Sequence, residues 1–248
     1  MKSIALIALA LFEFVALAHA QEPERRPPAG MVGVVRLPGI FGEGPCERSQ
    51  SKAVPLYSAP RARAPIGTIE VTRPAQLEQD GGCSSRDLGL RMRDGKVAAT
   101  LATIEIEYEL PAAIALAKSG PWCQLLLHSG TAWIHEECEA GFISIEALLA
   151  DKPLYLLEGA IDQARSQPGG SGAMPSGLQA SARNHGQQPL SARLLGHKTV
   201  GGHTWLHLEA SWGNDCERSP SPQEVFELWL PLRDASGRPQ VWFHSRGC

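Results

Sequence analysis

Two histidines near the end of the chain have the spacing of a zinc-binding motif. His203 and His207 lie four residues apart, which on a helix would place both imidazoles on one face. Gly201 and Gly202 precede them, however, and no glutamate follows His203 as the H-E-x-x-H motif requires. We therefore predict a strand, on which His203, Trp205 and His207 share one face, and we expect neither a metal site nor a cofactor.

Six cysteines could supply either a reactive thiolate or a set of disulfides: Cys46, Cys83, Cys123, Cys138, Cys216 and Cys248. No two of them form a C-x-x-C pair, so the usual motif of thioredoxin-like redox proteins and zinc ribbons is absent. An even number of cysteines in an exported chain indicates structural disulfides.

Hydrolase and nucleotide-binding motifs are also absent. The chain has no G-x-S-x-G, no P-loop and no G-x-G-x-x-G. The terminal Ser245 to Cys248 is similar to the S-H-G-C of L,D-transpeptidases, but Arg246 takes the place of the histidine. We therefore predict no catalytic residue. A Cys-His or Ser-His pair assembled by the fold stays an alternative, because such residues need not be adjacent in sequence.

All six tryptophans follow residue 120: Trp122, Trp133, Trp205, Trp212, Trp229 and Trp242. We expect most of them to pack in the core. Trp212 lies in the polar segment S-W-G-N-D, which predicts an exposed indole. The sequence thus predicts a ligand-binding surface around Trp212, with Trp205, His203 and His207 beside it.

The N-terminus predicts export. Residues 1–20 have a positive start, a short apolar run and an A-x-A site, as in a secretory signal peptide, so the mature protein would be periplasmic or secreted. Residues 21–30 are charged and Pro-rich, which predicts a flexible lead-in. No membrane span is expected after the signal is removed. The net charge of −3 gives no electrostatic footprint for nucleic acid.

A β-hairpin is predicted around a Gly-containing turn in the middle of the chain. Trp122 to Leu127 is apolar, Ser129 and Gly130 turn the chain, and Thr131 to Ile134 runs back. Cys123 and Cys138 flank this hairpin, so we pair them. We also predict Cys46–Cys83, which would hold the insertion around residues 76–97, and Cys216–Cys248, which would tie the C-terminal strand to the loop after Trp212.

Short alternating segments with turn signals between them predict further strands and a mainly β fold. The hairpin, with W-L-H-L and E-L-W-L-P-L near the end, resembles bacterial SH3-like domains. Residues 201–248 also resemble the ending of uncharacterised exported SH3-like proteins with a W-F-x-S-R-G-C terminus. The resemblance implies two small SH3-like barrels stapled by disulfides, over 31–150 and 151–248.

Two segments fit this scheme less directly. Residues 111–118, P-A-A-I-A-L-A-K, favour a helix by propensity, whereas the resemblance favours a strand, and we predict the strand. Residues 163–188 are rich in Gly, Ser, Pro and Gln and predict a linker or a long loop within the second domain.

The resemblance implies an exported, non-enzymatic binding module of the bacterial envelope. Its expected partner is peptidoglycan or an envelope protein. The alternatives are a cell-wall amidase or peptidase with a Cys-His or Ser-His pair, and an inhibitor of another secreted protein. The oligomeric state is not fixed by the sequence.

The number of free thiols distinguishes a non-enzymatic binding module from a cysteine hydrolase. Three disulfides leave no cysteine to titrate, whereas a catalytic cysteine leaves at least one. We expect no thiol in the native mature protein when it is titrated with a thiol reagent without reductant. A reactive thiol under these conditions would favour the hydrolase.

Overall fold

The computed structural model describes residues 26–41, 53–73, 87–107, 110–170, 172–186, 190–213 and 224–245. Its strands before residue 150 are β1 (Gly33–Val35), β2 (Val54–Leu56), β3 (Gly67–Arg73), β4 (Asp87–Met92), β5 (Val97–Thr100), β6 (Thr103–Glu107), β7 (Leu110–Ser119), β8 (Trp122–Leu127), β9 (Gly130–Ile134) and β10 (Phe142–Ser144). The later strands are β11 (Leu154–Leu156), β12 (Leu190–Val200), β13 (His203–Trp212), β14 (Val225–Pro231) and β15 (Val241–Phe243). The helices are short: α1 (Pro38–Phe41), α2 (Glu136–Gly141), α3 (Ile145–Leu149), the 3-10 turn η1 (Ala160–Gln163) and α4 (Leu178–His185).

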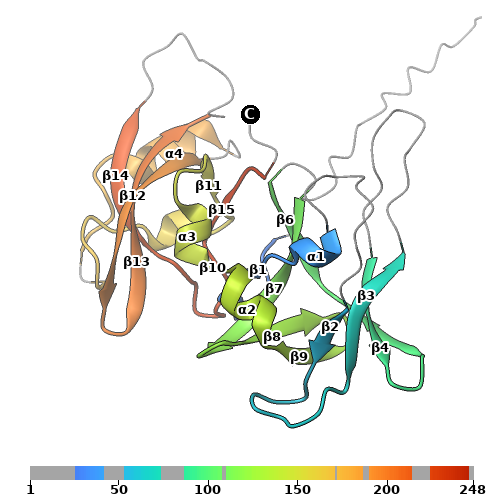
Figure 1. Ribbon diagram of the computed structural model, residues 1–248. Coiled ribbons are helices and arrows are strands. Elements are labelled where there is room, and N and C mark those ends of the chain that lie inside the picture. Colours follow the sequence, from blue (N-terminus) through green and yellow to red (C-terminus); the bar gives the residue numbers. More distant parts are fainter. Residues whose placement is uncertain are drawn as a thin grey trace, which may run out of the picture.

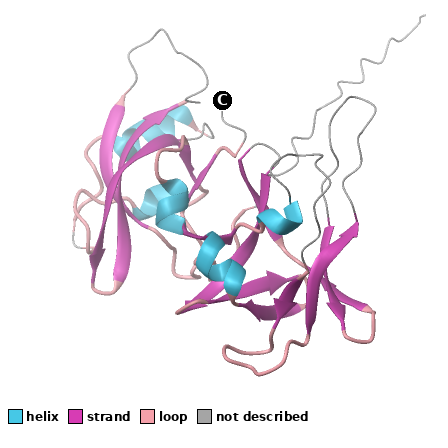
Figure 2. Cartoon of the chain, in the orientation of Figure 1, coloured by secondary structure: helices cyan, strands magenta, loops and turns pink. Residues whose placement is uncertain are grey.

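The strands form three open antiparallel sheets. The first has the order β10-β1-β7-β8-β9 with β6 beside β7, the second β2-β3-β4-β5 and the third β14-β13-β12-β11-β15. Figure 1 shows the second and third sheets at opposite ends, with the first sheet, α2 and α3 between them. Strands dominate the chain in Figure 2, and the prediction of a mainly β, disulfide-stapled fold is confirmed. None of the sheets is closed, so the number of barrels stays a prediction.

Strand β7 is buried on both of its faces. Ala112 and Ile114 point into one hydrophobic cluster, and Ala113 and Ala115 point into the other. A strand covered on both sides has no polar face, so residues 111–118 lack the alternation of a half-buried strand, while their alanines and leucine give them helix propensity. The strand prediction is confirmed for this segment.

The two clusters lie on opposite faces of the first sheet. One joins it to the second sheet, through residues such as Val35, Leu125 and Leu56. The other continues from Val34 through α3 into the third sheet, where it includes Phe243. The change of sheet falls at the predicted boundary near residue 150, but one hydrophobic cluster crosses it. The division into two domains stays a prediction.

Polar contacts also join the two halves. The Lys152 ammonium donates to the backbone carbonyl of Ile106 on β6 at 2.9 Å. The same ammonium lies 4.8 Å from the ring centroid of Phe243 on β15. Near the start of the described chain, the Gly30 amide donates to the carbonyl of Gly237 at 3.0 Å. Segments distant in sequence are therefore held together across the boundary.

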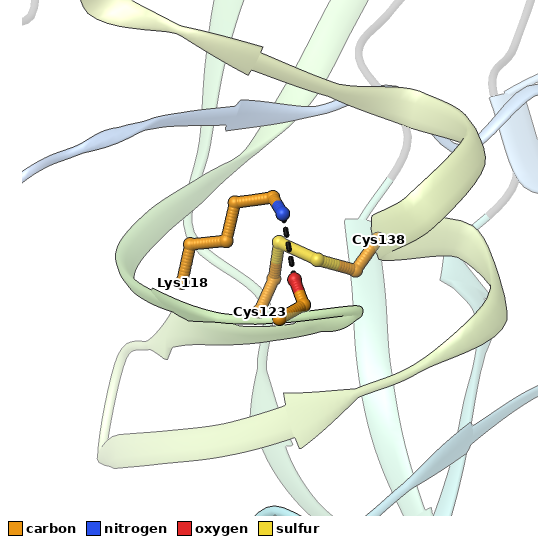
Figure 3. The surroundings of a disulfide bond; sticks show 4 residues. Lys118, Cys123 and Cys138 are labelled. Atoms are coloured by element: carbon orange, nitrogen blue, oxygen red, sulfur yellow. Dashed lines mark hydrogen bonds between the residues drawn. A yellow bond between two sulfur atoms is a disulfide. The ribbon is translucent and has the colours of Figure 1, made fainter.

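A disulfide joins Cys123 on β8 to Cys138 on α2, as predicted. Both cysteines are fully buried in the cluster between the first and second sheets. Figure 3 shows the disulfide beside the turn where the Lys118 ammonium donates to the Gly120 carbonyl at 2.6 Å. The disulfides predicted for Cys46–Cys83 and Cys216–Cys248 lie outside the described residues. Among the described cysteines no thiol is free.

The segment predicted as a linker or long loop contains secondary structure. Residues 163–188 include α4, whose Leu178 is fully buried in the cluster that reaches the third sheet. Leu178 and Ala182 pack against this cluster and His185 stacks on Trp212, so a helix of polar composition is held against the sheet. In the part of the chain that the structure describes, no helix is long and apolar enough to cross a membrane.

The disulfide makes a testable contribution to stability. It closes a loop with a sequence separation of 15 residues. The double variant Cys123→Ala, Cys138→Ala should lose about 3 kcal/mol of unfolding free energy, because the unfolded chain gains loop entropy. Urea unfolding against the parent protein measures this, with Ser129→Ala in the exposed hairpin turn as control. An unchanged unfolding free energy would contradict the stabilising role.

Candidate functional site

The outward face of the third sheet presents a histidine stacked on a tryptophan. His207 on β13 is directly opposite Trp229 on β14, and their rings are 4.5 Å apart with an interplanar angle of 4°. The His207 Nε2 donates to the Glu227 carboxylate at 2.6 Å. We call His207, Glu227 and Trp229 the second platform, because a similar group, described below, comes earlier in the chain. Both ring residues are half-buried, so their edges remain accessible from solvent.

Strand alternation positions this group. On β13, Leu206 and Leu208 point into the core, so His207 between them points outward. Its neighbour on β12 is Gly196, where an added Cβ would meet no atom within 4 Å. The surface beside the imidazole is therefore open on the β12 side.

A second group of the same kind lies on the hairpin formed by β8 and β9. Trp122 opens β8, and His135 follows β9 with its ring centroid 4.7 Å from that of Trp122. Tyr57 meets Trp122 edge to face at 5.1 Å. We call Tyr57, Trp122 and His135 the first platform. All three are half-buried.

Two interactions position the first platform. Tyr57 exchanges two backbone hydrogen bonds with Trp133 of β9, at 2.8 and 2.9 Å, which ties the end of β2 to the hairpin. The disulfide fixes the start of β8 against α2, directly after His135. The Trp122 and His135 rings are thus carried by cross-linked backbone.

Charged groups of both signs border the second platform. The Arg193 guanidinium donates to the Glu209 carboxylate at 2.8 Å, and Glu209 lies opposite Glu227 on the neighbouring strand. Both members of the ion pair are largely exposed, so the pair adds little to stability. These groups make the rim of the platform polar.

The structure brings two of the four predicted site residues onto the outward face. His203 is exposed at the start of β13, and His207 belongs to the second platform. Trp205 lies between them but is only 7% exposed. An added Cβ on Gly170 would lie 4.0 Å from its ring, so the segment around Gly170 covers it. Trp205 is therefore covered and offers no ligand surface of its own.

The expectation of an exposed Trp212 is wrong. Strand β13 continues through Trp212, which pairs with Leu190, and the indole points into the core with 6% of its surface exposed. The His185 ring stacks on it at 4.9 Å with an interplanar angle of 8°. Its Nε1 is buried and has no hydrogen-bond partner within the described residues. The polar residues that follow Trp212 suggested a loop, but pairing with β12 extends the strand.

The platform residues Trp122, Trp229, His135 and Glu227 were not selected from sequence. A signal did exist for Trp229, because alternation in E-L-W-L-P-L puts Glu227 and Trp229 on one face and the three leucines on the other. The partner on the next strand could not be read, since it depends on the register between β13 and β14.

Two common kinds of catalytic centre, a free cysteine thiolate and a metal site, are absent from the described residues. Both described cysteines are in the disulfide, and no group of three His, Cys, Asp or Glu residues within the described ranges is placed to hold a metal ion. What the chain presents on its outward faces is aromatic rings, imidazoles and carboxylates in fixed positions.

The burial of Trp212 predicts a stability effect. Trp212→Ala should lower the unfolding free energy by about 3 to 5 kcal/mol, because it empties a tryptophan-sized volume in the core. Trp229→Ala, at a half-buried position, should cost clearly less. Urea unfolding of both variants tests this, and equal small losses would contradict the placement of Trp212 in the core.

Comparison with known proteins gives no information about function. No family model matches the chain, and neither a curated protein nor a solved structure matches it. The two Trp-His platforms are therefore the features from which we argue function.

Proposed function

We propose that the protein is an exported, non-enzymatic binding module of the bacterial cell envelope that recognises peptidoglycan through its two platforms. The observation that carries the proposal is that a half-buried tryptophan meets a histidine on the outward face of a hairpin twice, at Trp122 with His135 and at Trp229 with His207. Similar groups at two places in one chain suit a polymer with repeating units.

The chemistry of the platforms supports a saccharide-containing ligand. The C–H face of a sugar ring packs on an indole, while its hydroxyls and amides need nearby donors and acceptors. His135 on the first platform and His207 with Glu227 on the second supply such polar groups beside each tryptophan. Binding sites commonly combine an aromatic surface with a few fixed polar groups.

Two weak sites on one chain can bind a polymer tightly. Once one platform is occupied, the second binds at a high local concentration of ligand, so the combined affinity can exceed either single affinity by about 10²-fold or more. The shared core holds the two halves together, which supports simultaneous contact with one polymer.

The proposed location has support from the disulfide. Disulfides persist in oxidising compartments such as the periplasm, and Cys123–Cys138 is buried in the core, where it stabilises the fold. The SH3-like assignment has support from the third sheet, where a bridge between Arg233 and Pro239 joins the segments that follow β14 and precede β15. The edges of that sheet thus approach each other.

Co-sedimentation of residues 21–248 with purified peptidoglycan sacculi tests the proposal. We expect saturable pelleting, with about tenfold weaker apparent affinity for Trp122→Ala or Trp229→Ala and no pelleting for the double variant, because each change removes one aromatic anchor. Val97→Ala and Leu195→Ala are the controls, since both residues are exposed, apolar and outside the platforms.

The same samples separate the competing functions. Absence of pelleting, or pelleting that the double variant retains, would overturn the proposal. Release of soluble fragments from the sacculi during incubation would favour the alternative of a cell-wall hydrolase. Unchanged circular dichroism of each variant shows that lost pelleting does not reflect unfolding.

A further inference from the structure

A small hollow opens where α3 meets the end of the third sheet, and none of its lining residues belongs to either platform. It has a volume of about 150 Å³ and is lined by Glu146, Gly202, His203, Thr204, Pro231, Leu232 and Arg233. A hollow of this size holds several water molecules or a ligand the size of an amino acid or dipeptide. Its walls come from both sides of residue 150.

Opposite charges face the hollow without pairing directly. The Arg233 guanidinium and the Glu146 carboxylate attract each other electrostatically, yet no ion pair joins these two described side chains. Burial is the main cause that lowers the pKa of Arg233, and the attraction of Glu146 opposes it. A partly desolvated cation gains more from a bound anion than an exposed one.

Two further polar side chains line the hollow, those of Thr204 and His203. The Thr204 backbone carbonyl accepts from Leu232, but its hydroxyl makes no hydrogen bond to a described residue. The His203 imidazole is exposed at the mouth. The hollow therefore offers a cation and a hydroxyl donor on one side and a carboxylate on α3.

The loop after β14 fixes the position of Arg233. Its guanidinium donates to the Gly237 carbonyl at 3.1 Å, which leaves other donors of the fork available. The Asp234 carboxylate accepts from the backbone amides of Ser236 and Arg238 at 2.8 and 2.9 Å. The Ser236 hydroxyl bond is the largest cause that holds the pKa of Asp234 below its ordinary value, so the carboxylate stays charged and the turn stays closed near neutral pH.

From this geometry we propose that the hollow is a binding site for a small zwitterion, a free α-amino acid or the end of a short peptide. The ligand carboxylate contacts Arg233 and the Thr204 hydroxyl, and its ammonium contacts Glu146. A simple anion would satisfy only Arg233 and would be repelled by Glu146, and a simple cation would meet the reverse. The proposal is independent of the peptidoglycan platforms.

Titration of the full mature chain with the dipeptide alanyl-alanine, followed by NMR of the His203 ring and Arg233 side-chain signals, tests the site. We expect saturable shifts with a dissociation constant of about 1 mM, as for a ligand with few contacts. Glu146→Gln and Arg233→Met should each weaken binding about tenfold, which is the loss of one charge-assisted hydrogen bond. Glu139→Gln and Arg63→Met are matched controls on exposed groups and should leave binding unchanged.

The two variants test the contributions of Arg233 and Glu146 separately. Arg233→Met removes a bond to the turn, so Glu146→Gln provides the decisive variant if the turn is disturbed. Acetate and methylammonium, titrated singly, should each bind more weakly than the dipeptide. Equal binding of acetate and dipeptide, or dipeptide binding insensitive to Glu146→Gln, would overturn the proposal, as would the absence of saturable shifts. If the protein still pellets with sacculi while any of these results is obtained, only the proposal for the hollow is overturned, and the proposal for the platforms stands.

Discussion

The arrangement of the three sheets depends on the burial of strand β7 on both faces. Small and branched apolar side chains on each side, such as Ala113 and Ile114, let one strand contribute to two hydrophobic clusters. The first sheet thereby becomes the middle layer, with the second sheet against one face and α3 with the third sheet against the other. A single polar side chain at this strand would have to be buried without a partner, which costs several times the thermal energy.

Packing in the two clusters also explains why the two platforms lie at the surface. Leu125 on β8 and Leu206 on β13 pack in the two clusters, whereas Trp122 on β8 and His207 on β13 are half-buried at the surface. Trp122 and the β14 residue Trp229 each contact a histidine ring there.

Local patterns were sufficient for much of the fold. The hairpin from Trp122 to Ile134 and the pairing of Cys123 with Cys138 follow from a Gly-containing turn between two apolar runs, which acts over short distances in sequence. Strand β13 and its shared face of His203 and His207 also follow from alternation.

The features that could not be predicted depend on contacts distant in sequence. Trp212 is buried because β13 pairs with β12 as far as Leu190, and α4 brings His185 onto the indole. The stacking of His207 on Trp229 depends on strand register, and the meeting of Glu146 with Arg233 depends on how the sheets pack. No local pattern of residue types encodes these distances, so the sequence alone predicted an exposed Trp212 where the structure buries it.

The hydrogen bond from Gly30 to Gly237 has a consequence for how the chain acquires its structure. Residues close to the beginning of the described chain cannot complete their contacts until residues near its end are available. The same holds for the hydrophobic cluster that includes both Val34 and Phe243. Such long-range closure slows folding and leaves apolar strands exposed in the meantime. During synthesis from the N-terminus, the apolar strand β1 therefore stays without its full core until β15 (Val241–Phe243) has left the ribosome.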